Sequence, residues 1–251
     1  MSSAKNINDF NPNAAGNKNL NIFGLPFTPE QAKIVLLPVP WDVTVSYNDG
    51  TANAPIAIFD ASFQVDLFDA FAGNFWKPGI AMLTEYKEIS QKNQALRKKA
   101  NLVIEHIING ESINKSKEQH SYLKLLNKEC EIHKNAIKVK SLELLTENKL
   151  VGIVGGDHSC PLGLIEALAT KYEHFGILQI DAHADLRKAY EGFKYSHASI
   201  MYNAMKNPQI SKLVQVGIRD FCEEEMNRIH QSKNRISTFF DRDLKNKIRK
   251  S

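Results

Sequence analysis

The sequence predicts an α/β fold of three layers, in which a mainly parallel sheet is flanked by helices. From residue 149 onward, apolar segments alternate with segments of helical period, as in a parallel sheet with helices on its faces. The apolar segments are nearly continuous, which is expected of strands that are covered on both sides. A chain of 251 residues is also long enough to bury a substantial core.

Residues 1–32 are polar and rich in asparagine, and we interpret them as an N-terminal arm that precedes one α/β domain at residues 33–251. The first strand is predicted at residues 33–40, because KIVLLPVP is continuously apolar. A loop with Asp-Gly and Asn-Ala-Pro turn signals follows, and residues 54–69 then have helical spacing. The segment GIAML, at residues 79–83, is a candidate short strand.

A long charged stretch at residues 90–148 has the period of helices, with a break at residues 109–110. Its histidines, His106, His120 and His133, are expected to be solvated. Beyond it, strands are predicted at KLVGIVGG, FGILQIDAH, KLVQVGIRD and RISTFF, and helices at CPLGLIEALATKY, ASIMYNAMK and CEEEMNRIHQS.

The composition argues against several classes of protein. The formal net charge is +4, and the basic residues are spread among acidic ones, which does not favour nucleic-acid binding. Cys130, Cys160 and Cys222 form neither a disulfide framework nor a CxxC zinc pair, which fits a reducing compartment. No signal-peptide segment or membrane-length apolar run is found in the sequence. We therefore expect a cytoplasmic protein that binds neither membranes nor nucleic acid.

Two motifs with metal-binding side chains follow neighbouring predicted strands. They are GGDHS at residues 155–159 and DAHAD at residues 181–185. In parallel α/β sheets, ligands bind beyond the carboxyl ends of the strands, where both motifs lie. Asp181, His183 and Asp185 alternate along the chain, so an extended backbone would point all three to one side.

With His158 from the first motif, the chain offers four donors. Two neighbouring carboxylates repel each other, and a divalent cation removes that penalty. Oxygen ligands with imidazole suit manganese, iron or zinc. Asp157 is a candidate for orienting a metal ligand through a hydrogen bond, without binding the metal itself. Cys160 is interpreted as a packing residue. For either motif alone, a hydrogen-bonded Asp–His pair without metal is the simpler explanation, but two motifs on consecutive strands favour a metal site.

These motifs resemble two ligand motifs of the ureohydrolases, the family of arginases, agmatinases and formiminoglutamases. LLPVPWDVTVSYNDGTANAPIAIFDAS resembles the family's first strand, substrate-side loop and helix. YSHASIM resembles its histidine-bearing loop, and VQVGIRD its next strand. The resemblance extends from about Ile34 to about Arg219 and is greatest to agmatinase-type members.

The resemblance implies an arginase/deacetylase-type fold with two Mn²⁺ ions in each subunit. It also implies hydrolysis of a linear amidine, agmatine or a related guanidino compound, to urea and an amine, a reaction of polyamine metabolism. A complete member of the family would be expected to form a homo-oligomer. The partner at the site would be the small guanidino substrate.

Carried over residue by residue, the resemblance implies that His158 and Asp185 bind one ion and that His183 binds the other. Asp181 would bridge the two ions. Asp185 would also handle a proton of the attacking water. His197 would lie outside the metal shell and shuttle protons, so the implied catalytic residues are Asp185 and His197.

The family has a later Asp-x-Asp ligand motif and a still later glutamate that helps to hold the substrate. We expect a fold that lacks its C-terminal part, because the sequence ends before either would be expected. Asp241 and Asp243 have the right spacing, but the basic run after them resembles a surface helix. We therefore do not assign them as ligands, and with four donors one metal could still bind.

Three alternatives to an agmatinase-like enzyme are consistent with parts of the sequence. The chain could be a non-catalytic or degenerate ureohydrolase fragment. It could be a formiminoglutamase, a guanidine-type hydrolase or another amidine hydrolase of the same family. A zinc deacetylase-like amidohydrolase is a further possibility, but GGDHS together with DAHAD argues against it.

Overall fold

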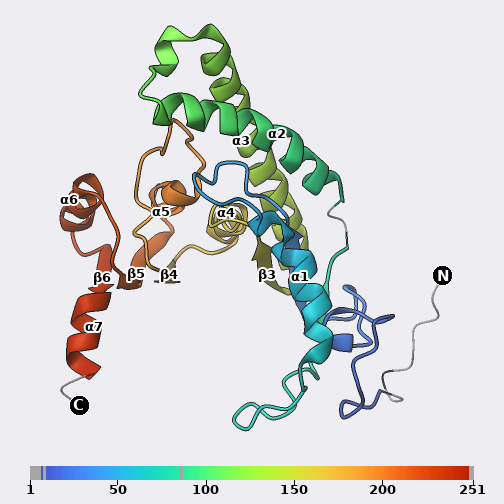
Figure 1. Ribbon diagram of the computed structural model, residues 1–251. Helices are drawn as coiled ribbons and strands as arrows, with labels where there is room; N and C mark the ends of the chain where they lie inside the picture. The colour runs from blue at the N-terminus through green and yellow to red at the C-terminus, as the bar shows by residue number, and fades with distance from the viewer. Residues whose placement is uncertain (1–6, 8–9, 85–86, 249–251) are drawn as a thin grey trace.

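The computed structural model describes residues 7, 10–84 and 87–248, and it confirms the predicted α/β class (Figure 1). The strands and α-helices are, in chain order, β1 (Ile34–Val39), α1 (Ala54–Ala61), β2 (Ile80–Met82), α2 (Lys87–Ile108), α3 (Lys117–Thr146), β3 (Leu150–Gly155), α4 (Leu162–Lys171), β4 (Phe175–Ile180), α5 (Ile200–Ala204), β5 (Ile210–Ile218), α6 (Glu223–Gln231), β6 (Ile236–Phe240) and α7 (Asp241–Ile248).

All strand pairs are parallel, as predicted, but they form two three-stranded sheets and not one. The orders are β2-β1-β3 and β4-β5-β6. Within the described residues, no strand pairs with the second edge of β3 or of β4. In Figure 1, α4 lies in front of the region between the two sheets, and it connects β3 to β4. The difference arises because an apolar pattern shows which segments are extended but not which strands pair.

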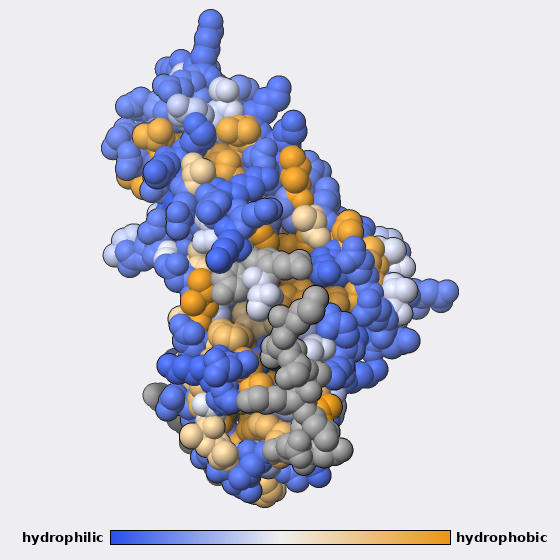
Figure 2. Space-filling model, turned by 90° about the vertical axis from the view of Figure 1, so that its right-hand side faces the viewer, coloured by the Kyte–Doolittle hydropathy of each residue, from blue (hydrophilic) through white to orange (hydrophobic). Residues whose placement is uncertain are grey.

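The two long helices α2 and α3 form the predicted charged region. α2 ends at Ile108, two residues before Gly110, whose φ of +77° favours glycine. Leu96, Ala100 and Val103 are buried on one face of α2, as their helical spacing predicted. Figure 2 shows the right-hand side of Figure 1, where hydrophilic residues cover most of the surface and hydrophobic residues form small groups among them. Among the helices of the described ranges, none combines the length and apolar composition needed to cross a membrane.

The segment before β1 is tied closely to the first sheet. Ile22, Leu25 and Phe27, which belong to the predicted polar arm, are buried in a core cluster with residues of β1 and β2. The side chain of Asn21 accepts hydrogen bonds from the backbone N–H groups of Ile22, at 2.7 Å, and of Met82, at 2.8 Å. One amide side chain therefore fixes the segment to the short strand β2.

His133 is buried and the His106 side chain is only 14% exposed, so the prediction that these two histidines are solvated was wrong. The His133 ring stacks on Trp41 with a centroid distance of 3.9 Å and an interplanar angle of 15°. His133 Nε2 has no hydrogen-bond partner among the described residues. Burial, together with the charge of Lys92, lowers the pKa of His133 to about 3. The helical pattern did not reveal this because Trp41 comes from a loop far away in the sequence.

The buried His133 predicts that stability falls in mild acid. The unfolded chain takes up a proton near the ordinary value of 6.5, whereas the folded chain does so only near 3. The unfolded state therefore binds more protons across this window, and the free energy of unfolding falls as the pH decreases. The slope is at most about 1.4 kcal/mol per pH unit. In urea denaturation, His133→Phe should reduce the loss of stability between pH 7 and pH 5 by up to about 2 kcal/mol.

The matched control for His133 is His120→Phe, an exposed position on the same helix. It should leave the pH dependence as in the unsubstituted chain. Equal pH dependence in His133→Phe and in the unsubstituted chain would contradict a neutral buried imidazole.

One face of the second sheet is apolar and poorly covered. Leu178 is 65% exposed and Ile180 is 79% exposed, and both point to the same side of β4. Leu178 pairs in register with Val214 on β5, and Ile180 pairs with Val216. Val216 in turn pairs with Phe239 on β6, which is 45% exposed. A contiguous apolar sheet face of this kind favours association.

We predict that this sheet face makes the chain self-associate. Burying an exposed leucine contributes about 1.5–3 kcal/mol, so Leu178→Lys should weaken self-association by at least about tenfold. Leu102→Lys, at an exposed position on α2, is the control and should have little effect. Sedimentation velocity over a range of concentrations measures the difference. Equal association of the two variants would show that another surface is responsible.

Candidate metal centre

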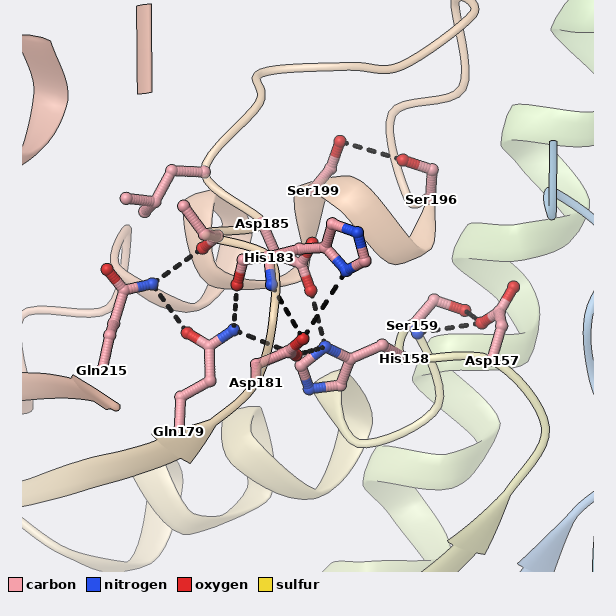
Figure 3. Close-up of polar contacts among 12 residues, drawn as sticks. Asp157, His158, Ser159, Gln179, Asp181, His183, Asp185, Ser196, Ser199 and Gln215 are labelled. Carbon is pink, nitrogen blue, oxygen red and sulfur yellow. Dashed lines mark hydrogen bonds and ion pairs between the residues drawn. The ribbon is translucent and has the colours of Figure 1, made fainter. Parts of the chain in front are cut away.

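The segments after β3 and β4 meet at one point, although the two strands belong to different sheets (Figure 3). His158 lies after β3, whereas Asp181 and Asp185 lie after β4. His158 Nδ1 is 3.0 Å from Asp181 Oδ2 and 2.6 Å from Asp185 Oδ2. One donor atom from each of the three residues lies within 4.8 Å of the other two. The structure therefore brings together three of the four predicted metal ligands.

The turn that presents His158 depends on a close approach between two backbones. A Cβ atom on Gly156 would lie 2.0 Å from the carbonyl oxygen of Trp41, so only glycine fits there. The next residue, Asp157, donates its backbone N–H to the same oxygen at 2.9 Å. Asp157 Oδ1 accepts from the backbone N–H of Ser159 at 2.8 Å. The contacts of Asp157 thus shape the turn, whereas the sequence suggested that it orients a ligand.

The charged forms of His158, Asp181 and Asp185 stabilise one another, because the imidazole becomes cationic and the carboxylates are anionic. Burial alone would lower the pKa of His158, but its hydrogen bonds to Asp181 and Asp185 and their negative charges raise it to about 9. Burial alone would raise the pKa of Asp181, but hydrogen bonds from His158, from the His183 N–H and from Gln179 hold it well below its usual range. A protonated imidazole here takes the place of a cation between two carboxylates.

Asp185 has a strained backbone that aims its buried carboxylate at His158. Its φ is +54°, in the left-handed region that aspartate adopts more readily than most residues. The Asp185 carbonyl oxygen accepts from the N–H groups of Met201 and Tyr202 at the start of α5, at 3.0 and 3.2 Å. The next N–H, of Leu186, donates to Glu225 Oε1 at 2.9 Å. Strain of this kind persists only where surrounding contacts fix it, and it is typical of functional sites.

The structure does not bring His183 into the three-residue group. Its side chain is 60% exposed, and its Nδ1 lies 3.7 Å from Asp181 Oδ1. The argument from an extended chain fails here because β4 ends at Ile180 and Asp185 is left-handed. The two oxygens of Asp181 nevertheless face the two different histidines, since Oδ2 is near His158 and Oδ1 is near His183.

The three donors fit a divalent cation. Two carboxylate oxygens and one imidazole nitrogen form a donor set that suits manganese, iron or zinc. The two carboxylates lie 3.0 and 2.6 Å from His158 Nδ1, so their negative charges favour a positive charge at this point. Asp241 and Asp243 lie instead in the first turn of α7, where each is near a basic residue of the same helix.

A cavity of about 440 Å³ adjoins the donors. Its lining includes Asp185, His183 and His197, together with Ser46 and Tyr47 from the loop after β1. His197 begins the 3₁₀ turn His197–Ser199. Its Nδ1 is buried and has no hydrogen-bond partner within the described part of the chain. An imidazole with a free nitrogen beside the donors has the chemistry of a proton carrier.

Sequence analysis missed a row of polar side chains behind Asp181, in which the two glutamines are buried and the threonine is partly buried. Gln179, Gln215 and Thr238 are paired in register across β4, β5 and β6. Gln179 Nε2 donates to Asp181 Oδ2 at 3.3 Å and to the His183 carbonyl oxygen at 3.1 Å. Figure 3 shows Gln179 and Gln215 pointing toward the segment after β4.

The row is hydrogen-bonded from end to end. Gln215 Nε2 donates to Gln179 Oε1 at 2.7 Å and to the Ala184 carbonyl oxygen at 2.8 Å. Thr238 Oγ1 donates to Gln215 Oε1 at 2.8 Å. The signal in the sequence was a glutamine inside each of two apolar strands, FGILQI and KLVQV, which is unfavourable unless the amide is hydrogen-bonded.

The comparison with protein families agrees with this geometry. The model of the arginase family matches residues 32–250. This chain therefore belongs to the arginase family, and the resemblance stated from its motifs is confirmed.

Two curated relatives are named as ureohydrolases of N(1)-aminopropylagmatine. The chain is 29% identical over 199 residues to N(1)-aminopropylagmatine ureohydrolase of Thermus thermophilus, covering 79% of this chain and 55% of the relative. It is 23% identical over 214 residues to the enzyme of that name from Synechocystis, covering 85% of this chain and 58% of the relative. The chain thus spans a little over half the length of these relatives.

Solved structures show the same fold. The agmatine ureohydrolase of Thermoplasma volcanium superimposes with a TM-score of 0.61 at 24% identity, covering 89% of this chain and 62% of that one. The arginase from Medicago truncatula gives a TM-score of 0.60 at 25% identity, covering 86% and 58%.

The row behind Asp181 predicts that a residue on β5 influences metal binding. Gln215→Leu leaves Gln179 Oε1 and the Ala184 carbonyl oxygen without their donor, so the ligand segment loses a fixed position. Loss of such a supporting contact lowers metal affinity by about 10- to 100-fold. We expect a reduction of this size for Mn²⁺, measured by calorimetric titration. Gln231→Leu, at an exposed position of α6, is the control. Unchanged affinity in a folded Gln215→Leu chain would contradict the role.

Proposed function

We propose that this chain carries the metal-binding part of a manganese-dependent ureohydrolase that converts agmatine or a related guanidino compound to urea and an amine. The observation that carries the proposal is the convergence of His158, Asp181 and Asp185 from two motifs on different sheets. Membership of the arginase family supports the reaction class.

In this proposal, His158 and Asp185 would hold one Mn²⁺ ion and His183 would help to hold a second. Asp181 would contribute to holding both ions, and the proximity of its two oxygens to different histidines supports that role. A pair of divalent cations supplies Lewis-acid activation of water and a positive field at the reacting carbon.

The protein's own groups move the protons. Asp185 lies at the donor cluster and lines the cavity, so its carboxylate is placed to accept a proton from the attacking water. His197 lines the same cavity and has a free buried Nδ1, so it is placed to carry a proton between the site and the departing amine.

The substrate assignment draws on the relatives. Two of them are named as ureohydrolases of N(1)-aminopropylagmatine, and a structural neighbour is named as an agmatine ureohydrolase. Agmatine is therefore the first substrate to test. Formiminoglutamate and other amidines are the related alternatives. These compounds share the reacting carbon, beside which the donor cluster would lie, and they differ in the part of the molecule that the cluster would not contact.

A second candidate function is that of a non-catalytic ureohydrolase-like protein. One observation favours it: His183 lies outside the three-donor group, so the structure does not assemble the ligands of a second ion. A second ion held by few ligands would bind weakly and would place water poorly, and small misplacements lower the rate steeply.

The test measures retained Mn²⁺ and urea released from agmatine. The unsubstituted chain should retain Mn²⁺ after desalting, and Asp181→Ala should lose it, because Asp181 contacts both histidines. We expect slow Mn²⁺-dependent urea release by the unsubstituted chain and none by Asp181→Ala. His197→Ala should retain Mn²⁺ but slow turnover by about 10²- to 10⁴-fold.

Other outcomes separate the two functions. Retained Mn²⁺ without any urea release would favour the non-catalytic candidate. Mn²⁺ retention that is the same in Asp181→Ala and in the unsubstituted chain would contradict the assigned site.

A further inference from the structure

The loop after β1 forms one wall of the site cavity. Ser46 and Tyr47 line the cavity of about 440 Å³ together with His183, Asp185 and His197. A second cavity, of about 400 Å³, is lined by Asp49, Gly50 and neighbouring residues of the same loop and by residues of α2. Trp41, Val43 and Thr44 are buried, but residues 46–50 are partly or fully exposed beside the two cavities, so polar contacts must hold that part of the loop.

Arg97 on α2 supplies the central contacts. Its Nη1 donates to the carbonyl oxygen of Val43 at 3.0 Å and to that of Val45. Its Nε lies 3.2 Å from Asp49 Oδ2. One guanidinium group therefore binds three points of the loop, on both sides of Ser46 and Tyr47. A planar fork with fixed donors can make this set of contacts, and an ammonium group cannot reproduce it.

A second anchor lies one helical turn earlier on α2. Asn93 donates to Asp42 Oδ1 at 2.8 Å and accepts from the Asp42 N–H at 2.8 Å. Asp42 Oδ2 in turn accepts from the N–H groups of Gly50 and Ala52 at 2.8 and 3.0 Å. Asn93 thus fixes the base of the loop, whereas Arg97 fixes the part that carries the cavity-lining residues.

The backbone of the loop needs such support. Asn48 has a φ of +51° and Gly50 a φ of +121°. An asparagine in the left-handed region is held there by its surroundings. Tyr47 is 82% exposed, so burial does not hold its ring. Ser46 Oγ donates to Glu191 Oε2 at 2.8 Å, which joins the loop to the chain before His197.

We propose that Arg97 is a positioning residue for substrate binding. By clamping Val43, Val45 and Asp49, it holds Ser46 and Tyr47 at the rim of the site cavity, where they contact the part of the substrate beyond the guanidinium group. The exposed Tyr47 ring suits a cationic amine tail. This inference rests on the proposed function for the identity of the substrate. The contacts of Arg97 with the loop, which we call the clamp, do not depend on that function.

The first part of the test measures hydrogen exchange of the loop in the absence of substrate. In hydrogen exchange of the full chain, peptides covering residues 43–53 should exchange at least about tenfold faster in Arg97→Met than in the unsubstituted chain. Arg97→Lys should give an intermediate rate, because it keeps the charge and loses the fork. Lys98→Met, at an exposed neighbouring position, is the control and should not change the rate. Peptides from residues 149–187 should be unaffected in all variants.

The second part measures agmatine binding to the Mn²⁺-loaded chain by calorimetry. Arg97→Met and Tyr47→Ala should each raise the Kd by about tenfold, whereas retained Mn²⁺ stays the same. Unchanged exchange in Arg97→Met would overturn the clamp. Faster exchange with an unchanged agmatine Kd would overturn the role in substrate binding. If the unsubstituted chain binds Mn²⁺ but not agmatine, the proposed substrate is wrong, and the exchange measurement alone decides the clamp.

Discussion

The structure around the site depends on one electrostatic constraint, the placement of two carboxylates beside one imidazole. Asp181 Oδ2 and Asp185 Oδ2 both lie within 3.0 Å of His158 Nδ1. Two ionised carboxylates this close repel each other, and a positive charge between them removes that repulsion. The surrounding chain accommodates this requirement with a left-handed aspartate, a glycine turn against the Trp41 carbonyl oxygen and a buried glutamine row.

The polar support of the site comes from elements distant in the sequence. Gln215 and Thr238 reach Asp181 through Gln179, so β5 and β6 take part in holding a ligand that follows β4. Arg97 on α2 holds the loop beside the site cavity in a comparable way. In both cases a side chain outside the donor cluster fixes the backbone that lies beside it, which is how preorganised sites reach their accuracy.

Sequence reasoning predicted the fold class, and it singled out three side chains that the structure brings together, but it did not predict their arrangement. The apolar runs gave the parallel strands, and the two motifs led to His158, Asp181 and Asp185, because strand ends with clustered donors are rare without a reason. The pairing of the strands into two sheets, the burial of His133 and the exposed position of His183 were not predictable. Each depends on contacts between segments far apart in the chain, or on a local departure from extended backbone at Asp185.

The division into two sheets has a consequence for how the molecule holds together. His158 follows a strand of the first sheet, whereas Asp181 and Asp185 follow a strand of the second. Any cation shared by these three side chains is a cross-link between two separately hydrogen-bonded halves. Its binding free energy is then linked to the docking of the halves, since an ion that binds only the docked form shifts that equilibrium by mass action. The ion would stabilise the tertiary structure in addition to activating water.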